Sequence, residues 1–283
     1  MGSQMLKTNY HTHTIFCDGN NSTDEIAEEA VKKGFDILGF SSHAMFPFSS
    51  SWHINPKNYN SYVESVLKTK EKYQDKIKIL LGFEADYAFP VSKPAFDIYK
   101  KFDPDFLIGS VHYIFTERGR LAVDYGAEKL QECIKKLFNG DTKKLVCEYF
   151  YQEREMLKKS DFSILGHCDL IRKNNKILNM YNENDFWYRK EIKATADQIK
   201  KSGIIVEVNT GAIARGYMED VYPSQEFLSL LKERNIPVTI SSDAHKKEDL
   251  DFAFDKALEQ IKKASYSELA YIDIDRKVKF QKI

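Results

Sequence analysis

Three features that mark large classes of protein are missing from this sequence of 283 residues. Its 42 basic residues equal its 42 acidic residues in number, so the chain lacks the positive charge with which proteins bind the phosphates of a nucleic acid. No run approaches the roughly 18 consecutive apolar residues of a membrane span, and the chain does not open on the pattern of a signal peptide. We therefore expect a protein that binds neither nucleic acid nor a membrane.

Cysteine is scarce, and its spacing fits neither a disulfide framework nor a zinc ribbon. No two of the four cysteines form a Cys-x-x-Cys pair; they are Cys17, Cys133, Cys147 and Cys168. We interpret them as reduced thiols of a cytoplasmic protein. A hydrophobic fraction of 42% and a charged fraction of 30% are typical of a globular chain with a buried core.

Short apolar runs alternate with longer amphipathic stretches along the chain. The strands expected from this pattern are 6–13, 37–40, 77–83, 106–112, 162–165, 204–208 and 237–240. The expected helices are 23–34, 58–73, 93–102, 127–138, 143–159, 185–202, 224–234 and 247–264, and 271–280 is expected to add a strand at an edge. Such alternation favours an α/β fold with parallel strands and helical crossovers. Seven units in under 290 residues fit a closed barrel better than the alternative, an open doubly wound sheet.

Nothing in the composition divides the chain. No low-complexity linker or charge block interrupts it, so we expect residues 1–283 to form one domain. We interpret the four residues that precede Met5 as a cloning remnant. The sequence makes no prediction of the oligomeric state.

Six of the seven histidines and two carboxylates stand at the ends of expected strands. These residues are His11, His13, His43, Glu84, His112, His167, Asp243 and His245. In a parallel barrel the C-terminal ends of the strands meet on one face, so these side chains should converge at one mouth. The period of two along a strand also aims both histidines of His11-Thr12-His13 the same way.

So many imidazoles in one place predict a metal site. A lone histidine after a strand is more often a hydrogen-bonded polar residue, but unrelated histidines would be spread over helices and loops. A cluster of this size needs a cation near neutral pH, because protonated imidazoles repel one another. Mixed imidazole and carboxylate ligands suit zinc, iron or manganese rather than calcium. His53 falls in a loop and is expected to bind no metal.

An ordered set of short motifs carries these residues. The motifs are His11-Thr12-His13, Asp18-Gly19, Ser42-His43, Gly82-Phe83-Glu84, Ser110-Val111-His112, Gly166-His167-Cys168-Asp169, Glu207-Val208-Asn209-Thr210 and Ser242-Asp243-Ala244-His245. In order and completeness they resemble those of the PHP (polymerase and histidinol phosphatase) family, and within it the monofunctional histidinol-phosphate phosphatases. The resemblance implies a distorted (β/α)7 TIM-like barrel with a metal site at the C-terminal ends of the strands.

The resemblance also implies two to three divalent metal ions. The first ion would be held by His11, His13, Glu84 and Asp243. Glu84 would bridge to a second ion held by His112 and His167, and a third would be held by Asp18, His43 and His245. Some members of the family have histidine where this chain has Asp18. A hydroxide that bridges the ions beside Glu84 would attack the phosphorus of the substrate.

The activity that the resemblance implies is hydrolysis of L-histidinol phosphate in histidine biosynthesis. Arginine offers the forked donors that a phosphate prefers, so Arg172 and Arg215 are candidate phosphate contacts, with a solvated surface position as the alternative for each. Glu117 is a candidate partner for the ammonium group of the substrate. Candidate aromatic walls are Tyr113, Phe48 and Trp52.

Two other functions compete with this one. The same metals could serve a phosphodiesterase, an exonuclease or a phosphatase of another small ester, although zero net charge disfavours a nucleic-acid substrate. A metal-binding scaffold without turnover is the other alternative, and the complete set of ligand residues disfavours it.

Overall fold

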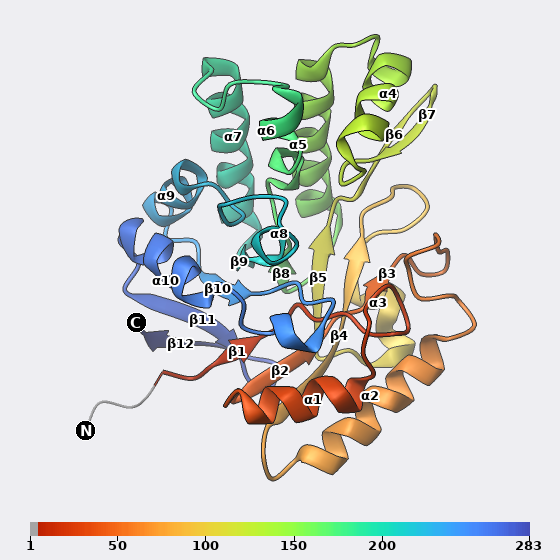
Figure 1. Cartoon of the computed structure of the whole chain (residues 1–283), viewed down its shortest axis with the longest axis vertical. Helices are drawn as coiled ribbons and strands as arrows, with labels where there is room; N and C mark the ends of the chain where they lie inside the picture. Colours follow the sequence, from red (N-terminus) through yellow and green to blue (C-terminus); the bar gives the residue numbers. More distant parts are fainter. Residues whose placement is uncertain (1–4) are drawn as a thin grey trace.

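A computed structural model describes residues 5–283, so the suspected cloning remnant lies outside the described residues. Seven parallel strands form the barrel in the order β1-β2-β4-β5-β8-β9-β10 (Figure 1). Their bounds are β1 Thr8–Asn9, β2 Ile37–Phe40, β4 Lys78–Asp86, β5 Phe106–Ser110, β8 Ile164–Leu165, β9 Ile205–Asn209 and β10 Val238–Ser241. Beyond β1 and β10, Thr12 pairs in parallel with Ala244 and nearly closes the ring. The barrel prediction is confirmed, and the open sheet is excluded.

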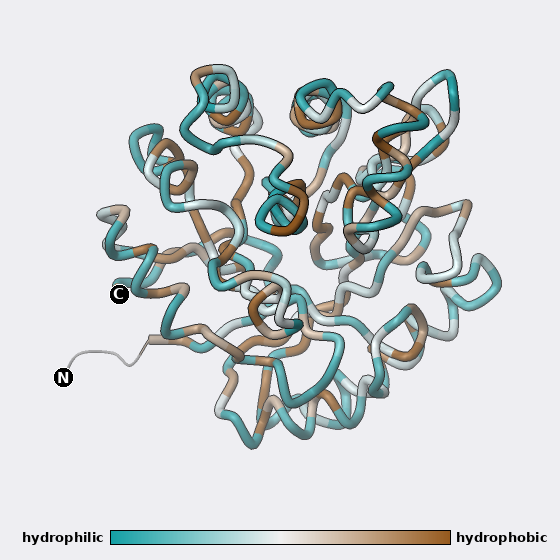
Figure 2. The backbone as a smooth tube through the Cα atoms, turned by 45° about the horizontal axis from the view of Figure 1, so that its top comes forward, coloured by the Kyte–Doolittle hydropathy of each residue, from teal (hydrophilic) through white to brown (hydrophobic). Residues whose placement is uncertain are grey.

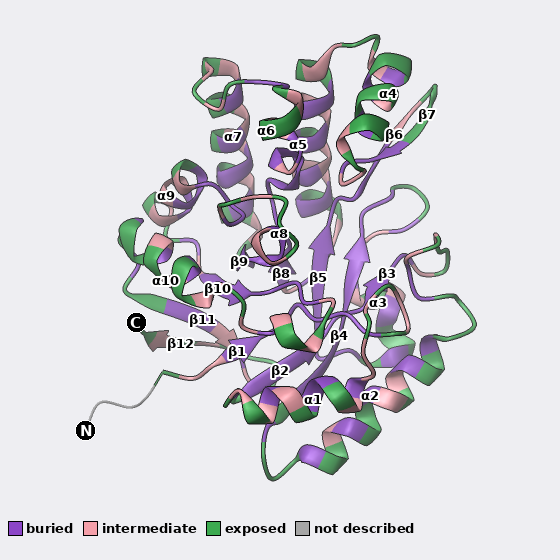
Figure 3. Ribbon diagram, in the orientation of Figure 1, coloured by how far each residue is buried: buried purple, intermediate pink, exposed green. Residues whose placement is uncertain are grey.

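Helices surround the barrel, and most of them have one buried side and one exposed side (Figure 3). They are α1 Thr23–Lys32, α2 Tyr59–Tyr73, α3 Phe96–Tyr99, α4 Ala127–Phe138, α5 Thr142–Lys159, α6 Asn175–Leu178, α7 Phe186–Ser202, α8 Gly211–Ala214, α9 Gln225–Glu233 and α10 Phe254–Lys263. Hydrophobic residues lie toward the strands and hydrophilic ones on the outer turns (Figure 2). Among the described residues, no helix combines the length and the apolar character that crossing a membrane requires.

Two expected helices are shorter than the sequence pattern indicated. In 93–102, Ala95 pairs with Asp161, so only α3 and a 3-10 turn at Lys100–Phe102 follow. In 247–264, a 3-10 turn at Lys247–Asp249 precedes α10, and the left-handed backbone of Ala253, with φ of 57°, separates the two. The four cysteines are free thiols, as expected.

Five strands were missed or misplaced by the sequence pattern. The short β3 (His43–Ala44) pairs with β4, and β6 (Tyr113–Thr116) forms an antiparallel hairpin with β7 (Gly119–Ala122). The expected edge strand at 271–280 is instead a separate hairpin of β11 (Glu268–Ile272) and β12 (Val278–Lys282). A backbone hydrogen bond from Asp273 to Lys277 closes its turn.

The β11–β12 hairpin covers the end of the barrel where the strands begin. Ala270 and Ile272 pack against an apolar cluster that fills the barrel there, made of Tyr10, Ile37, Leu80, Phe106, Ile108, Ile164 and Ile205. The Tyr10 hydroxyl donates to the Ile272 carbonyl at 2.9 Å and accepts from the Ile272 amide at 2.8 Å. With this end packed by apolar side chains, polar groups can gather only at the opposite mouth.

The ring of Phe106 occupies the barrel interior where two neighbouring strands carry glycine. A Cβ atom at Gly82 would lie 2.5 Å from this ring, and one at Gly39 would lie 2.6 Å from it. Because such distances are far below van der Waals contact, any larger residue would displace the ring. The glycines therefore set how tightly the strands close around Phe106.

Gly82→Ala is expected to lower the free energy of unfolding by about 1–3 kcal/mol, since an overpacked core strains its neighbours. The measurement is the urea midpoint. The matched control is Gly126→Ala, where φ is −55° and an added Cβ would meet nothing within 4 Å. Equal midpoints for the two variants would contradict this account of the core.

Candidate metal centre

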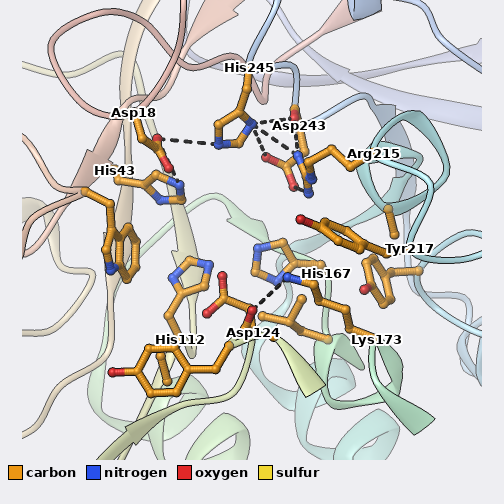
Figure 4. A pocket seen from close by; sticks show the side chains of 17 residues that line it. Asp18, His43, His112, Asp124, His167, Lys173, Arg215, Tyr217, Asp243 and His245 are labelled. Atoms are coloured by element: carbon orange, nitrogen blue, oxygen red, sulfur yellow. Dashed lines mark hydrogen bonds and ion pairs between the residues drawn. The ribbon is translucent and has the colours of Figure 1, made fainter. Parts of the chain in front are cut away.

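The nine residues predicted as metal ligands lie together at the mouth of the barrel, and Figure 4 shows the six that face the cavity there. Their donor atoms form four groups, within each of which all atoms lie within 4.8 Å of one another. The groups are His13, Asp18, His43 and His245; His11, His13 and Asp243; His11, Glu84 and His167; and His43, Glu84 and His112. The convergence that the strand-end pattern predicted is therefore present in the structure.

Glu84 lies at the centre of the cluster and is completely buried. Its Oε2 atom lies 3.1 Å from His11 Nε2 and 2.6 Å from His43 Nδ1. Its Oε1 atom lies 2.9 Å from His167 Nε2 and 3.4 Å from His112 Nε2. Because β3 pairs with β4 so that His43 stands opposite Glu84, the sheet register itself sets part of this arrangement.

Two further carboxylates complete the mouth. Asp243 Oδ1 lies 3.0 Å from His13 Nε2, and Asp243 has a left-handed backbone with φ of 50°, which is uncommon outside glycine. Asp18 is more exposed, and its Oδ1 atom lies 3.4 Å from His245 Nε2 and 3.6 Å from His43 Nε2. The cluster thus has a buried part around Asp243 and a more exposed part around Asp18.

Two buried carboxylates behind the cluster, for which no role was predicted from the sequence, orient its histidines. Glu207, on β9, lies with Oε2 2.9 Å from His11 Nδ1, and Asp86, on β4, lies with Oδ1 2.7 Å from His112 Nδ1. A carboxylate on the far nitrogen of an imidazole is the usual support of a metal-binding histidine, since it fixes the ring and its tautomer. The spacing Glu84-x-Asp86 was a signal for Asp86, because alternate strand residues share a face.

The electrostatics of the cluster favour bound positive charge. Burial would raise the pKa of Glu84, but the surrounding imidazoles, His11 first among them, hold it well below its ordinary value. Burial would lower the pKa of His112, yet the carboxylates of Asp86 and Glu84 raise it to about 10. By contrast, burial and the neighbouring His43 and His245 hold the pKa of His13 well below its ordinary value. The carboxylates thus require cationic partners, and either protonated imidazoles or metal ions can supply the positive charge.

Three buried atoms of the cluster lie within 3.1 Å of an oppositely charged or polar neighbour, yet these contacts lack the geometry of a hydrogen bond. These atoms are His11 Nε2, His43 Nδ1 and Glu84 Oε2. Buried polar atoms are normally paired, and an ion shared between imidazole nitrogens and a carboxylate oxygen would satisfy all three. The donor set of imidazoles and carboxylates also matches the ligands of zinc, manganese or iron. The residues present therefore fit a divalent metal centre.

A cavity of about 390 Å³ opens in front of the cluster. Six of the nine cluster residues face it: Asp18, His43, His112, His167, Asp243 and His245. Arg215, predicted as a phosphate contact, also lines it, and donates to Asp243 Oδ2 at 2.8 Å. Lys173, Asp124 and Tyr217 line it as well (Figure 4).

Two predicted substrate contacts lie elsewhere. Arg172 is buried away from this cavity, where its guanidinium contacts the Glu183 carboxylate and donates to the Val221 carbonyl. Glu117 is exposed in the turn between β6 and β7 and does not line the cavity. Lys173, the residue after Arg172, and Asp124 do line it, and neither was predicted from the sequence. Of the suggested aromatic walls, Trp52 lines the cavity, whereas Tyr113 and Phe48 do not.

Comparison with known proteins places these features in a family. The model of the PHP domain matches residues 9–211. The histidinol-phosphatase of Bacillus subtilis is 26% identical over 273 residues, which cover 90% of this chain and 100% of that protein. A structure of a proposed histidinol phosphatase from Listeria monocytogenes superposes with a TM-score of 0.76 at 20% identity, covering 88% of this chain and 99% of that one.

A second structure shares the fold over nearly the whole length. It is the histidinol phosphate phosphatase of Lactococcus lactis in complex with zinc, L-histidinol and phosphate, with a TM-score of 0.68 and 21% identity, covering 98% of this chain and 100% of that one. The family model spans Glu84 on β4 and three histidines that follow β1, β5 and β8, namely His11, His112 and His167. From this match and from the barrel that places those residues together, the chain belongs to the PHP domain family.

Proposed function

We propose that this chain hydrolyses L-histidinol phosphate to L-histidinol and phosphate as a metal-dependent phosphomonoesterase of histidine biosynthesis. The observation that carries the proposal is Glu84, whose two oxygens face imidazoles of four strand ends beside an open cavity. The name of the Bacillus subtilis relative and the ligands of the Lactococcus lactis structure support the choice of substrate. We further propose that residues 1–283 act as one cytoplasmic domain.

Two or three divalent ions would occupy the cluster. His11, His13, Glu84 and Asp243 would hold the first, Glu84 with His112 and His167 the second, and Asp18 with His43 and His245 the third. The zinc in the Lactococcus lactis structure favours zinc, and the donor set also suits manganese or iron. Bound ions would lower the pKa of water toward neutrality and neutralise charge on the phosphoryl oxygens.

The cationic side chains of the cavity would bind the phosphate group. Arg215 is held in place by the Asp243 side chain and carbonyl, at 2.8 and 2.9 Å, and presents a planar donor fork at the cavity. Lys173 is anchored by the Asp124 carbonyl, which its Nζ contacts at 2.7 Å. Both cations flank the donor groups, so a phosphate between them would lie next to the ions.

The remaining lining residues suit the organic half of the substrate. Of the three acidic residues that line the cavity, Asp18 and Asp243 belong to the donor groups and Asp124 does not. Asp124 would therefore bind the ammonium group in place of Glu117, which lies in an exposed turn outside the cavity. Trp52, Tyr125 and Tyr217 offer aromatic surface for an imidazole.

The test of this function is release of phosphate from L-histidinol phosphate by the purified, metal-loaded protein. We expect turnover that a chelator abolishes, with no degradation of a labelled oligonucleotide under the same conditions. Metal-dependent cleavage of the oligonucleotide would favour the nuclease alternative. Turnover of other small esters without L-histidinol phosphate would reject the substrate, and inertness toward every ester would favour a metal-binding scaffold.

Substitutions in the cluster should separate ligands from their supports. His13→Ala and Glu84→Ala are expected to lose bound metal together with activity. Glu207→Gln should keep the fold and weaken metal affinity about 10- to 100-fold, because His11 loses the carboxylate that orients it. Metal content by mass spectrometry and titration of the stripped protein with Zn²⁺ measure both effects. Glu64→Gln, on the exposed face of α2, is the control; full metal content in Glu84→Ala would refute the ligand assignment.

Arg215→Ala should impair use of the substrate while metal remains bound. Loss of one charge-assisted contact to phosphate is expected to lower kcat/KM about 10- to 100-fold. Steady-state kinetics with metal content determined on the same sample check this. Arg118→Ala, in the exposed turn of the β6–β7 hairpin, should behave like the unsubstituted protein, and Arg215→Ala kinetics indistinguishable from that control would place the phosphate contact elsewhere.

A further inference from the structure

The loop between β3 and α2 begins and ends beside the metal centre. The segment 45–54, called here the 45–54 loop, leaves from His43 and returns to it, since the Ile54 amide donates to the His43 carbonyl at 2.9 Å. Compact loops whose ends meet in this way often carry function. Near the end of this loop, half-buried Trp52 lines the cavity in front of the metal centre and His53 is buried behind it.

His53 connects this loop to the barrel through a buried carboxylate. Its side chain is fully buried, and Nε2 lies 3.1 Å from Asp86 Oδ2. The Ser50 amide donates to Nδ1 at 3.2 Å, and the Ser50 hydroxyl lies 2.7 Å from the same nitrogen. Because Nδ1 accepts the amide hydrogen, the ring proton resides on Nε2 and is donated to Asp86.

Asp86 serves two histidines at once. While Oδ2 accepts from His53, Oδ1 lies 2.7 Å from Nδ1 of His112, the proposed metal ligand. The carboxylate is completely buried, so water cannot replace either histidine as a hydrogen-bond partner. A shift of the carboxylate that alters one hydrogen bond therefore alters the other as well. The 45–54 loop and His112 are therefore joined through a single side chain.

Trp52 links the same unit to the cavity. Its ring stacks on the His53 ring, with centroids 3.8 Å apart. It meets the rings of His43 and His112 in T-shaped contacts, with centroid distances of 4.6 and 5.1 Å. Its indole Nε1 donates to the Tyr113 hydroxyl at 2.9 Å. Trp52 thus forms a wall of the cavity that touches two proposed ligands and rests on the residue that holds Asp86.

We propose that His53 is a positioning residue that couples metal binding at His112 to the placement of Trp52 against the substrate cavity, with Asp86 as the shared connection. The proposal rests on the proposed function in that it takes His112 as a metal ligand. Metal that fixes His112 stabilises the Asp86–His53 arrangement, and with it the loop. By reciprocity, an ordered loop strengthens metal binding.

The chain offers a direct signal for this coupling, because it contains only two tryptophans. Trp187 lies on α7 and does not line the cavity, so Trp187→Phe leaves Trp52 as the remaining indole emitter. In this background, stripped protein is titrated with Zn²⁺ while the emission of Trp52 and its quenching by acrylamide are followed. We expect Zn²⁺ to reduce quenching of Trp52.

His53→Phe keeps an aromatic ring under Trp52 but cannot donate to Asp86. We expect the Zn²⁺ affinity to fall about five- to tenfold and the quenching of Trp52 to become insensitive to Zn²⁺. His53→Gln, whose amide can donate to Asp86, should restore both. Ser51→Ala, an exposed position in the same loop, is the matched control.

Kinetics with L-histidinol phosphate separate positioning from a purely structural role. His53→Phe should raise KM about fivefold while kcat changes less than twofold, because loop placement rather than chemistry is altered. A protein that hydrolyses no L-histidinol phosphate would overturn the proposed function, yet the Zn²⁺ and quenching measurements would still report on the coupling.

Three results would overturn the coupling itself. One is a His53→Phe variant that matches the Trp187→Phe parent in both Zn²⁺ affinity and quenching. Another is a folded His53→Gln variant that fails to restore them. The third is additivity: if Asp86 is the shared connection, His53→Phe should add nothing to Asp86→Asn, whereas independent roles would give losses of affinity that multiply.

Discussion

The burial of one ionised carboxylate, that of Glu84, is the constraint on which the rest of the site depends. A buried carboxylate without partners is costly, and removing a partner from such a group is strongly destabilising. The barrel meets this cost by bringing imidazoles from separate strand ends within 2.6–3.4 Å of the two carboxylate oxygens. The contacts of Glu84 Oε2 with His11 and His43 lack the geometry of hydrogen bonds, and a divalent ion is the partner that these atoms fit chemically.

One end of the barrel stabilises the fold, and the other end carries the chemically active residues. Apolar side chains around Phe106 and the β11–β12 hairpin close the end where the strands begin, which fixes the strands relative to one another. At the other end, Asp86 and Glu207 hold the rings of His112 and His11 from behind. The packed end thereby supplies the rigidity that a precisely arranged set of metal ligands needs.

Much of this could be predicted from the sequence because strand ends are local features. Glu84 follows an apolar run directly, His11 and His13 end the first expected strand, and parallel strands must place their ends together. The supporting carboxylates were harder to find, since Asp86 and Glu207 acquire a role only through histidines on other strands. Their partners, His112 and His11, are 26 and 196 residues away in sequence.

The substrate contacts were predicted less well because they depend on irregular backbone. A 3-10 turn at Leu170–Arg172 follows β8, and it places Lys173 at the cavity and Arg172 among carboxylates behind it. The β6–β7 hairpin, which carries no Asn-Gly or Asp-Gly signal, moves Glu117 into an exposed turn and places Asp124 at the cavity instead. Neither displacement can be read from hydrophobic periodicity.

Anomalous diffraction at the zinc edge, from crystals of the protein grown with Zn²⁺, tests the central claim most directly. The account predicts peaks within coordination distance of Glu84 on both of its oxygens, one beside His11 and His13 and one beside His112 and His167. Absence of any peak near Glu84, with the imidazoles bonded to the carboxylates alone, would contradict it.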